Sequence, residues 1–198
     1  MSGAASLPAT YFDGVYAARD DPWSFETSPY EQAKYATTLA ALPEAHYGRA
    51  LEVGCSIGVL TARLAARCGT LLAVDVSDKA LEQARARCAG LGHVRFERLS
   101  FPAERPEGDF DLVVLSEVAY YWSLADLRGG LDWCAASLRP GGALVLVHWT
   151  HPVHDYPLGG DAVHDEAIVR TAPRLERALA ERHPDYRLDV FVAPGSPG

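Results

Sequence analysis

The fold of this chain is decided by the stretch Leu51-Glu52-Val53-Gly54-Cys55-Ser56-Ile57-Gly58 and by the run Leu71-Leu72-Ala73-Val74-Asp75 that follows it. The first is an apolar segment of strand length that ends in a glycine-bearing turn, and the second is a similar segment that ends in a carboxylate. In Rossmann-like folds the backbone approaches a nucleoside at such a turn, and an acid about 20 residues later binds the ribose hydroxyls. Asp75 follows Gly54 at this interval, so the two stretches predict a nucleoside site.

The spacing of the glycines excludes two other nucleotide-binding turns. Dinucleotide folds use G-x-G-x-x-G, but Ser56 stands where the middle glycine would be, and no reading frame restores the pattern. A Walker-type loop, G-x-x-x-x-G-K-[ST], is also absent from the sequence. The remaining pattern, acid-x-Gly-x-x-x-Gly, allows close backbone approach but provides little for phosphates. S-Adenosylmethionine fits this pattern, since it carries no phosphate and its methionine ammonium requires carboxylates or carbonyls.

The motif Glu52-x-Gly54-x-x-x-Gly58, taken with Asp75, resembles the class I S-adenosylmethionine-dependent methyltransferases. Two later segments resemble the fourth strand of that superfamily and the turn before its fifth: Phe110-Asp111-Leu112-Val113-Val114 and Leu138-Arg139-Pro140-Gly141-Gly142. The resemblance covers about residues 49–149. It implies a three-layer α/β fold, a doubly wound Rossmann-like methyltransferase fold with a mostly parallel sheet. It also implies S-adenosyl-L-methionine as the cofactor.

Within that superfamily the chain is similar to the NodS-type (nodulation protein S) N-methyltransferases, which methylate a glucosamine unit of lipo-chitooligosaccharide precursors. The segments that carry this similarity are Asp21-Pro22-Trp23, Tyr30-Glu31-x-x-Lys34-Tyr35, Glu52 to Thr61, Leu115-Ser116-Glu117-Val118-x-Tyr120-Tyr121 and Asp155-Tyr156-Pro157-Leu158. The similarity implies a small-molecule acceptor, above all an amino sugar such as a deacetylated chitooligosaccharide. Three alternatives stay open: an O- or C-methyltransferase, a non-catalytic S-adenosylmethionine-binding module and a nicotinamide oxidoreductase, which the missing glycine disfavours.

Charge and cysteine content narrow the partners and the environment. The formal net charge of −8 argues against a nucleic-acid substrate, which needs a basic surface. No apolar run approaches the roughly 18 residues of a membrane-spanning helix, and we expect no membrane partner. The four cysteines show no C-x-x-C spacing, which is typical of reduced packing residues in a cytoplasmic protein. The oligomeric state is not decided by the sequence.

The chain of 198 residues is expected to form one methyltransferase domain, 1–198, in which residues 46–149 are the cofactor-binding core. Predicted strands and helices alternate there, which indicates a parallel sheet. The predicted strands cover 50–53, 71–75, 94–97, 111–115 and 143–148. Helical spacing covers 59–68, 77–91 and 124–138, and Ser77 is a good N-cap for the second of these helices.

The two flanks of the core are expected to add helices. In residues 1–45, Ser28-Pro29-Tyr30-Glu31 predicts a capping box that opens a helix to about Leu42. The segment before this helix is rich in aromatic residues: Tyr11, Phe12, Tyr16, Trp23 and Phe25. Two roles for the segment stay open with equal weight, a cap over the mouth of the cofactor site and a helix packed on the sheet edge. Residues 150–198 are expected to hold an acceptor loop, helices over 161–170 and 174–182, and a strand over 187–192. Since only one strand is visible there, we expect the C-terminal edge of the sheet to be shortened.

Ligands of open α/β sheets bind beyond the carboxyl ends of the strands, and this rule selects the cofactor residues. The turn Gly54 to Gly58 is expected beneath the methionine portion, and Asp75 is expected to accept both ribose hydroxyls. Ser100 stands where many relatives carry an acid for the adenine amino group, so adenine recognition is expected to rely on backbone groups and apolar packing. The predicted cofactor residues are Glu52, Gly54, Cys55, Ser56, Gly58, Asp75, Val76, Leu99, Ser100 and Ser116.

The acceptor site is predicted at the ends of the fourth and fifth strands. Methyl transfer is an in-line displacement, so alignment is the main task of the enzyme. A carboxylate or histidine near an amine acceptor can orient the amine and take its proton. We predict Glu117 as the first acceptor-binding residue, with Tyr121 beside it, and His148 as a candidate base that faces the same cleft. An N-cap or a ribose contact is the alternative role for Glu117.

Two further groups of residues lie near these strand ends. His148, His151 and His154 are spaced by three, but Pro152 interrupts any helix that would stack them and no cysteine supports a zinc set, so we expect no metal site. An acceptor loop and simple surface histidines both remain open. Aromatic side chains that would stack on a sugar ring, or form a lid over an apolar acceptor, are Tyr120, Tyr121, Trp122, Trp149 and Tyr156.

Overall fold

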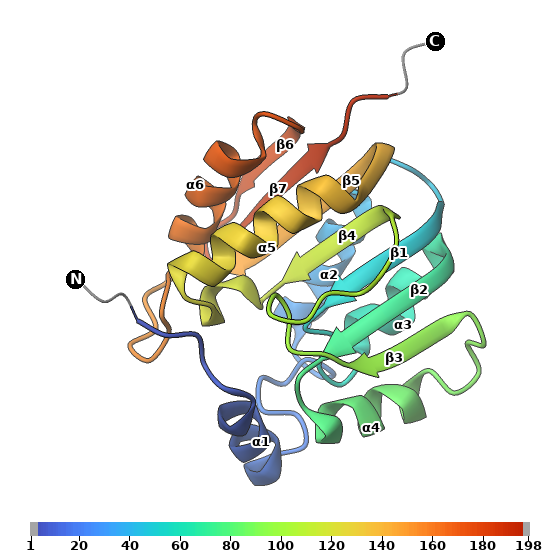
Figure 1. Ribbon diagram of the computed structural model, residues 1–198. Coiled ribbons are helices and arrows are strands. Elements are labelled where there is room, and N and C mark those ends of the chain that lie inside the picture. Colours follow the sequence, from blue (N-terminus) through green and yellow to red (C-terminus); the bar gives the residue numbers. More distant parts are fainter. Residues whose placement is uncertain (1–3, 196–198) are drawn as a thin grey trace.

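The computed structural model describes residues 4–195, which form a twisted sheet flanked by helices (Figure 1). The strands are β1 (Tyr47–Val53), β2 (Cys68–Asp75), β3 (Val94–Arg98), β4 (Phe110–Ser116), β5 (Leu138–Trp149), β6 (Glu176–Arg182) and β7 (Tyr186–Val192). The helices are α1 (Ala9–Ala18), α2 (Pro29–Ala40), α3 (Val59–Leu64), α4 (Asp78–Arg87), α5 (Leu124–Ser137) and α6 (Gly160–Thr171). Two short 3₁₀ turns are η1 (Ala65–Arg67) and η2 (Ala119–Tyr121).

The seven strands are ordered β3-β2-β1-β4-β5-β7-β6. Strands β1 to β5 pair in parallel, whereas β7 runs antiparallel to both of its neighbours, β5 and β6. Strand order reverses at β1, which has β2 on one side and β4 on the other, and such a reversal opens a crevice at the carboxyl ends of the strands. The predicted doubly wound, mostly parallel α/β fold is therefore confirmed.

The helices cover both faces of the sheet, because parallel strands that are apolar on both sides must be buried on both sides. One core cluster packs α5 and α6 against the sheet through Leu127, Leu131 and Val163. The opposite cluster packs α2, α3 and α4 against the other face. In Figure 1, α5 and α6 lie in front of the sheet, and α2 and α3 lie behind it. The result is the three-layer arrangement that was expected.

Several helix ends follow the capping signals of the sequence. The Ser28 hydroxyl accepts a hydrogen bond from the backbone N–H of Glu31 at the start of α2, with proline in the first turn. Ser77 caps α4 in the same way through the N–H of Ala80. The helix predicted over 59–68 is shorter, since α3 ends at Leu64 and Cys68 already begins β2. Strand β5 is longer than predicted, because the Pro-Gly-Gly turn forms a bulge within it.

The C-terminal region differs from the prediction in two respects. The helix predicted over 174–182 is wrong: residues 176–182 form β6, which pairs with β7 through a hairpin. The expected shortening of the C-terminal edge is wrong as well, because β6 and β7 complete a sheet of seven strands. The other two predictions for this region, a helix near 161–170 and a strand near 187–192, agree with α6 and β7.

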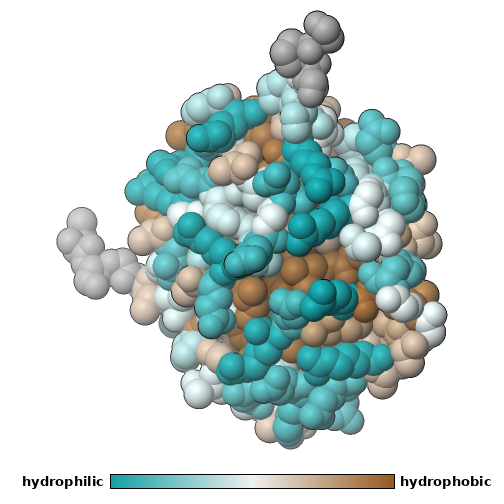
Figure 2. Space-filling view, turned by 45° about the vertical axis from the view of Figure 1, so that its right-hand side comes forward, coloured by the Kyte–Doolittle hydropathy of each residue, from teal (hydrophilic) through white to brown (hydrophobic). Residues whose placement is uncertain are grey.

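One face of the molecule is mainly polar. Figure 2 shows charged and polar residues over most of one face, with an apolar area exposed across its middle. Within residues 4–195, no helix combines the length and the apolar character needed to cross a membrane.

Candidate active site

A cleft of about 920 Å³, counted out to its opening, lies at the carboxyl ends of β1, β2 and β4. Its floor contains Gly54, Asp75 and Ser116, and its apolar wall contains Leu99 and Phe101. A smaller hollow adjoins it and shares Gly54, Ser56, Ser116 and Glu117 with it. The position of the cleft is the crevice that strand order predicts.

The turn after β1 brings the backbone to the floor of the cleft. Gly54 has φ +75°, and a Cβ there would lie 2.7 Å from a methyl carbon of Val118. Ser56 also adopts a left-handed φ of +51°. Both residues line the cleft, together with five other predicted cofactor residues: Asp75, Val76, Leu99, Ser100 and Ser116. A side chain at position 54 would therefore collide with the loop after β4, so glycine is required there.

Asp75 ends β2 and is held by the backbone. Its Oδ2 accepts a hydrogen bond from the N–H of Ser56 at 2.9 Å, and its Oδ1 accepts one from the N–H of Ser77 at 2.9 Å. Burial raises the pKa of this carboxyl, while the two backbone N–H groups oppose the rise. Each carboxylate oxygen keeps a free lone pair at the cleft. The side chain is therefore oriented to accept two hydroxyl groups of one ligand.

Gly58 lines neither the cleft nor the hollow within the described residues. It is the N-cap of α3 with φ +77°, and a Cβ would lie 2.9 Å from the Cα of Ala84 on α4. Its absence of a side chain thus allows α3 and α4 to pack closely behind the turn. The expected place of this glycine under a ligand is not what the structure shows.

Glu52 and Cys55 line the smaller hollow rather than the main cleft. Glu52 is 2% exposed, and its Oε2 has no hydrogen-bond partner among the described residues. Burial raises the pKa of Glu52 to about 8. A buried acceptor without a donor is costly, so this oxygen is available to a donor group of a ligand.

Glu117 lies where the cleft and the hollow meet. Its Oε1 accepts a hydrogen bond from Lys34 Nζ at 2.7 Å. Its Oε2 accepts two, from the hydroxyl of Tyr120 at 2.6 Å and from the backbone N–H of Trp149 at 3.0 Å. The backbone is left-handed at Glu117, with φ +55°, a conformation that costs free energy for a side chain other than glycine and is often found at functional sites. Three elements, α2, η2 and β5, thus hold this carboxylate at the end of β4.

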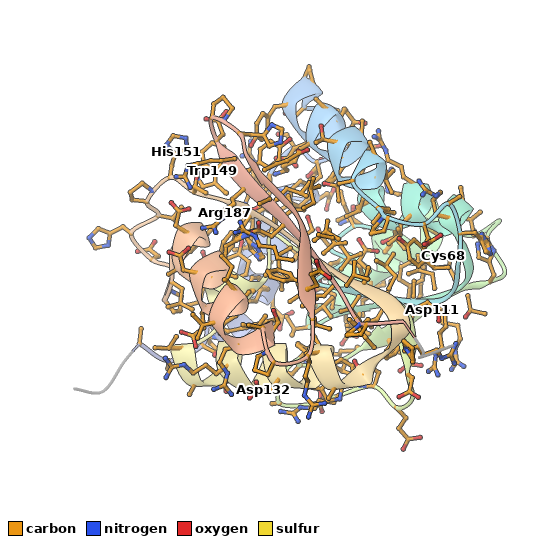
Figure 3. All side chains as sticks on the ribbon, turned by 90° about the horizontal axis from the view of Figure 1, so that it is seen from above. Cys68, Asp111, Asp132, Trp149, His151 and Arg187 are labelled. Carbon is orange, nitrogen blue, oxygen red and sulfur yellow. The ribbon has the colours of Figure 1, made fainter. Side chains whose placement is uncertain are left out.

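Tyr121 lines the cleft and belongs to the predicted aromatic group at the strand ends. Its ring packs edge-on against Phe12 of α1, and its hydroxyl bonds that of Tyr156 at 3.3 Å. Tyr120 stacks on Tyr156 with ring centres 4.9 Å apart. Trp149 packs edge-on against Tyr30 and lies beside His151 (Figure 3). Trp122 packs against Phe101, so the predicted aromatic residues do not form a single cluster.

The expectation that His148 faces the cleft is wrong. The residue is 0% exposed, and its Nε2 accepts a hydrogen bond from the backbone N–H of Ala119 at 3.2 Å. Its proton therefore lies on Nδ1 and is donated to His164 Nε2 at 3.2 Å, and His164 in turn donates from Nδ1 to Asp189 at 2.5 Å. Burial lowers the pKa of His148 well below its usual value. A neutral histidine with both nitrogens occupied cannot take a proton from an acceptor, so His148 supports η2 instead.

The other two histidines of the predicted triplet lie on the surface. His151 bonds Asp185 at 2.9 Å, and His154 is fully exposed. Because His148 is buried with His164, the three side chains do not converge. Among residues 4–195, no three His, Cys, Asp or Glu side chains are grouped as metal ligands.

The N-terminal segment, for which the sequence left two roles open, forms a wall of the cleft. Tyr16 of α1 bonds the Ser56 hydroxyl at 2.5 Å, and Trp23 and Phe25 line the same wall. Leu7 donates its N–H to the carbonyl of Tyr121 at 2.9 Å. Of the two roles left open, the structure supports a cap over the mouth of the cleft. Capping signals predict where a helix begins, but they do not predict which distant loop it will cover.

All charged residues that line the cleft and the hollow are acidic: Glu52, Asp75, Glu117 and Asp126. Asp126 accepts a hydrogen bond from Ser6, and neither residue belongs to a sequence motif that indicates a ligand site. No Lys, Arg or His lines these surfaces within the described residues. Such a lining favours cationic ligands over phosphates or carboxylates.

Comparison with known proteins assigns the family. A family model described as nodulation protein S (NodS) matches residues 15–176. The chain belongs to the NodS family. Nodulation protein S from Rhizobium tropici is 35% identical over 131 residues, which are 65% of this chain and 55% of that protein. The chain thus spans little more than half the length of that curated relative.

Two solved structures extend the comparison. A putative methyltransferase from Pseudomonas syringae is 39% identical, with a TM-score of 0.72, and the match covers 82% of this chain and 98% of that one. The N-methyltransferase NodS from Bradyrhizobium japonicum WM9, in complex with S-adenosyl-L-homocysteine, is 25% identical with a TM-score of 0.82, covering 94% and 98%. The predicted resemblance to NodS-type S-adenosylmethionine-dependent methyltransferases is confirmed, and with it the cofactor of the family.

The cleft of this NodS-family chain fits S-adenosylmethionine on its own evidence. The acidic lining suits a ligand with a sulfonium and an ammonium group. Asp75 presents two oxygens to a pair of hydroxyls, and Glu52 Oε2 lacks a donor. Leu99 and Phe101 provide an apolar wall for a base. The residues present would therefore hold the ribose through Asp75 and the cationic tail beside Glu52.

Proposed function

We propose that this NodS-family protein transfers a methyl group from S-adenosylmethionine to the nitrogen of a small amine, and that the acceptor is an amino sugar such as a deacetylated chitooligosaccharide. The bound cofactor supplies an electrophilic methyl group on a sulfonium sulfur. The residues of the chain bind and align the acceptor, which is the larger part of catalysis for such a displacement.

The observation that carries this proposal is the Glu117 carboxylate at the junction of the cleft and the hollow. It is fixed by Lys34, Tyr120 and the backbone of Trp149, and every other charged lining residue is also acidic. An amine enters such a site as an ammonium ion, which the carboxylate binds by a charge-assisted hydrogen bond. A hydroxyl acceptor gains no comparable attraction.

The amine must lose a proton before its lone pair can form the new bond to carbon. Both oxygens of Glu117 already accept hydrogen bonds from the chain, three in all. We therefore assign it to orienting the amine, while water at the cleft mouth takes the proton. The rate should rise with pH and level off near the pKa of the acceptor amine itself.

The test is a transfer assay with methyl-labelled S-adenosylmethionine. A deacetylated chitooligosaccharide and its fully N-acetylated counterpart form a matched pair, since they differ only at nitrogen. We expect label on nitrogen of the first and none on the second. Equal labelling of both, or label on oxygen or carbon of another metabolite alone, would contradict the amino-sugar proposal.

The relatives that support this proposal are the N-methyltransferase NodS and the nodulation proteins S. If calorimetry shows cofactor binding but no acceptor of any class is labelled, the protein is instead a non-catalytic binding module. Calorimetry therefore distinguishes a protein that does not bind the cofactor from one that binds it but transfers no methyl group.

A further inference from the structure

Lys34 is a buried cation beside an otherwise acidic site. The chain has only two lysines, Lys34 and Lys79, and Lys34 is 2% exposed. It lies on α2, which packs against the same face of the sheet as α3 and α4. Lysine is rarely buried so completely unless it is paired.

Lys34 is paired with two carboxylates at once. Its Nζ donates to Glu31 Oε1 at 2.9 Å and to Glu117 Oε1 at 2.7 Å. The Nζ also lies 5.1 Å from the ring centre of Tyr30. Burial alone would lower the pKa of Lys34, but the two carboxylates outweigh it and raise the pKa. The ammonium group therefore stays charged throughout the neutral range.

This contact is the link between α2 and the end of β4, 83 positions apart in the sequence. The remaining bonds to Glu117 reach the opposite oxygen: Tyr120 and the Trp149 N–H bind Oε2, whereas Lys34 binds Oε1. Without Lys34, Oε1 would have no donor among residues 4–195, and the carboxylate would be free to turn about its Oε2 contacts.

We infer that Lys34 is a positioning residue for the proposed methyl transfer: bridged to Glu31, it fixes Glu117 as an oriented carboxylate for the acceptor amine. This inference rests on the proposed function and names a residue that acts through Glu117 rather than on the acceptor. Lys34 lines neither the cleft nor the hollow.

A purely stabilising role explains the arrangement less well. Buried ion pairs return little net stability, because desolvation of the charges offsets their attraction. The chain uses arginine for 16 of its 18 Lys and Arg positions, yet a lysine stands here. The single nitrogen of a lysine reaches both carboxylates here, at 2.9 and 2.7 Å, whereas the larger guanidinium of arginine spreads its donors over a rigid planar fork. Such geometry suits a bridge between Glu31 and a carboxylate that must keep one orientation.

The test is a double-mutant cycle on the full chain with the variants Lys34→Met, Glu117→Gln and both together. Lys34→Met should lower kcat/KM for the amine acceptor by about 10- to 100-fold, as expected for loss of one charge-assisted hydrogen bond. Cofactor affinity, measured by calorimetry, should change by less than about threefold. In the Glu117→Gln background, Lys34→Met should have almost no further effect on kcat/KM, because the two residues act as one unit. Lys79→Met, at an exposed position on α4, is the matched control and should behave as the unmodified protein.

Three results would overturn the inference. The first is a double variant whose loss in kcat/KM equals the product of the two single losses. The second is an unchanged kcat/KM in Lys34→Met. The third is a parallel loss of cofactor affinity in Lys34→Met, which indicates general damage to the fold. If Lys34→Met does not fold, Glu31→Gln takes its place, since it keeps the lysine and should lower kcat/KM by a smaller factor. An unchanged kcat/KM in Glu31→Gln would then contradict the inference. If the unmodified protein labels no acceptor, the proposed function fails. A crystal structure of Lys34→Met then decides the positioning claim: a displaced Glu117 carboxylate supports it and an unmoved one refutes it.

Discussion

Substitution of Glu52 by glutamine should stabilise the cofactor-free protein at neutral pH while weakening cofactor binding. Glu52 is buried near the end of β1, and one of its oxygens has no partner among the described residues. Burial raises its pKa from 4.5 to about 8. Glutamine has nearly the same shape and carries no charge to bury, so the substitution removes the titration with little change in packing.

The size of the effect follows from linkage between protonation and folding. Between pH 4.5 and 8 the native protein keeps a proton on Glu52 that the unfolded chain has lost, so stability falls as pH rises through this window. At about 1.4 kcal/mol per pH unit, the cost of Glu52 is about 1 kcal/mol at pH 5 and about 3 kcal/mol at pH 7. The stability of Glu52→Gln relative to the unmodified protein should therefore increase by about 2 kcal/mol over this range.

Urea unfolding of both proteins at half-unit pH steps from 5 to 8 measures this difference directly. Every other titrating group is common to the two proteins, so only Glu52 makes the difference between their free energies of unfolding depend on pH. A free-energy difference that stays constant with pH would refute the reasoning, because it would mean that Glu52 is ionised in the native protein. Calorimetry with S-adenosylmethionine on the same samples should show weaker binding by the glutamine variant, since the cationic cofactor favours the ionised form of Glu52 and glutamine has no ionised form.

Two further predictions concern His148 and Asp75. His148→Leu leaves the Ala119 N–H and His164 Nε2 without partners and should cost about 2–5 kcal/mol in urea unfolding, whereas His148→Gln, which offers an acceptor and a donor, should cost clearly less; equal losses would contradict the assigned bonds. Burial lowers the pKa of both His148 and His164, so native stability should fall as pH drops below about 6.5, where the unfolded chain takes up protons first, and this acid slope should be shallower in His148→Leu. Asp75→Asn should weaken S-adenosylmethionine binding by about 10- to 100-fold in calorimetry, and unchanged affinity would exclude the ribose role.

The fold was predictable where local patterns and long-range pairing agree. Five apolar runs of strand length became β1 to β5, and the caps at Ser28 and Ser77 began the helices that they predict. Strand β6 was missed, because residues 174–182 contain strong helix formers at helical spacing. Pairing with β7 overrides that preference, and a pattern confined to one segment carries no information about such a partner.

The site was predictable in its floor but less in its walls. The turn at Gly54 and the acid at Asp75 follow from motif spacing, and both line the cleft. The role of His148 could not be read from its place at the end of β5, because it depends on His164 and Asp189, which lie far along the chain and meet it only in the folded core. Lys34 was visible as part of a motif, but its contact with Glu117 spans 83 positions.

The central claim is that the Glu117 carboxylate orients an amine acceptor in an acidic cleft. It is tested most directly by comparing the unmodified protein with Glu117→Gln for methyl transfer to a deacetylated chitooligosaccharide, with cofactor affinity measured in parallel. The account predicts that kcat/KM for the acceptor falls by about 100-fold, equivalent to about 3 kcal/mol, while cofactor affinity is retained. Retention of full acceptor kcat/KM by Glu117→Gln would contradict it.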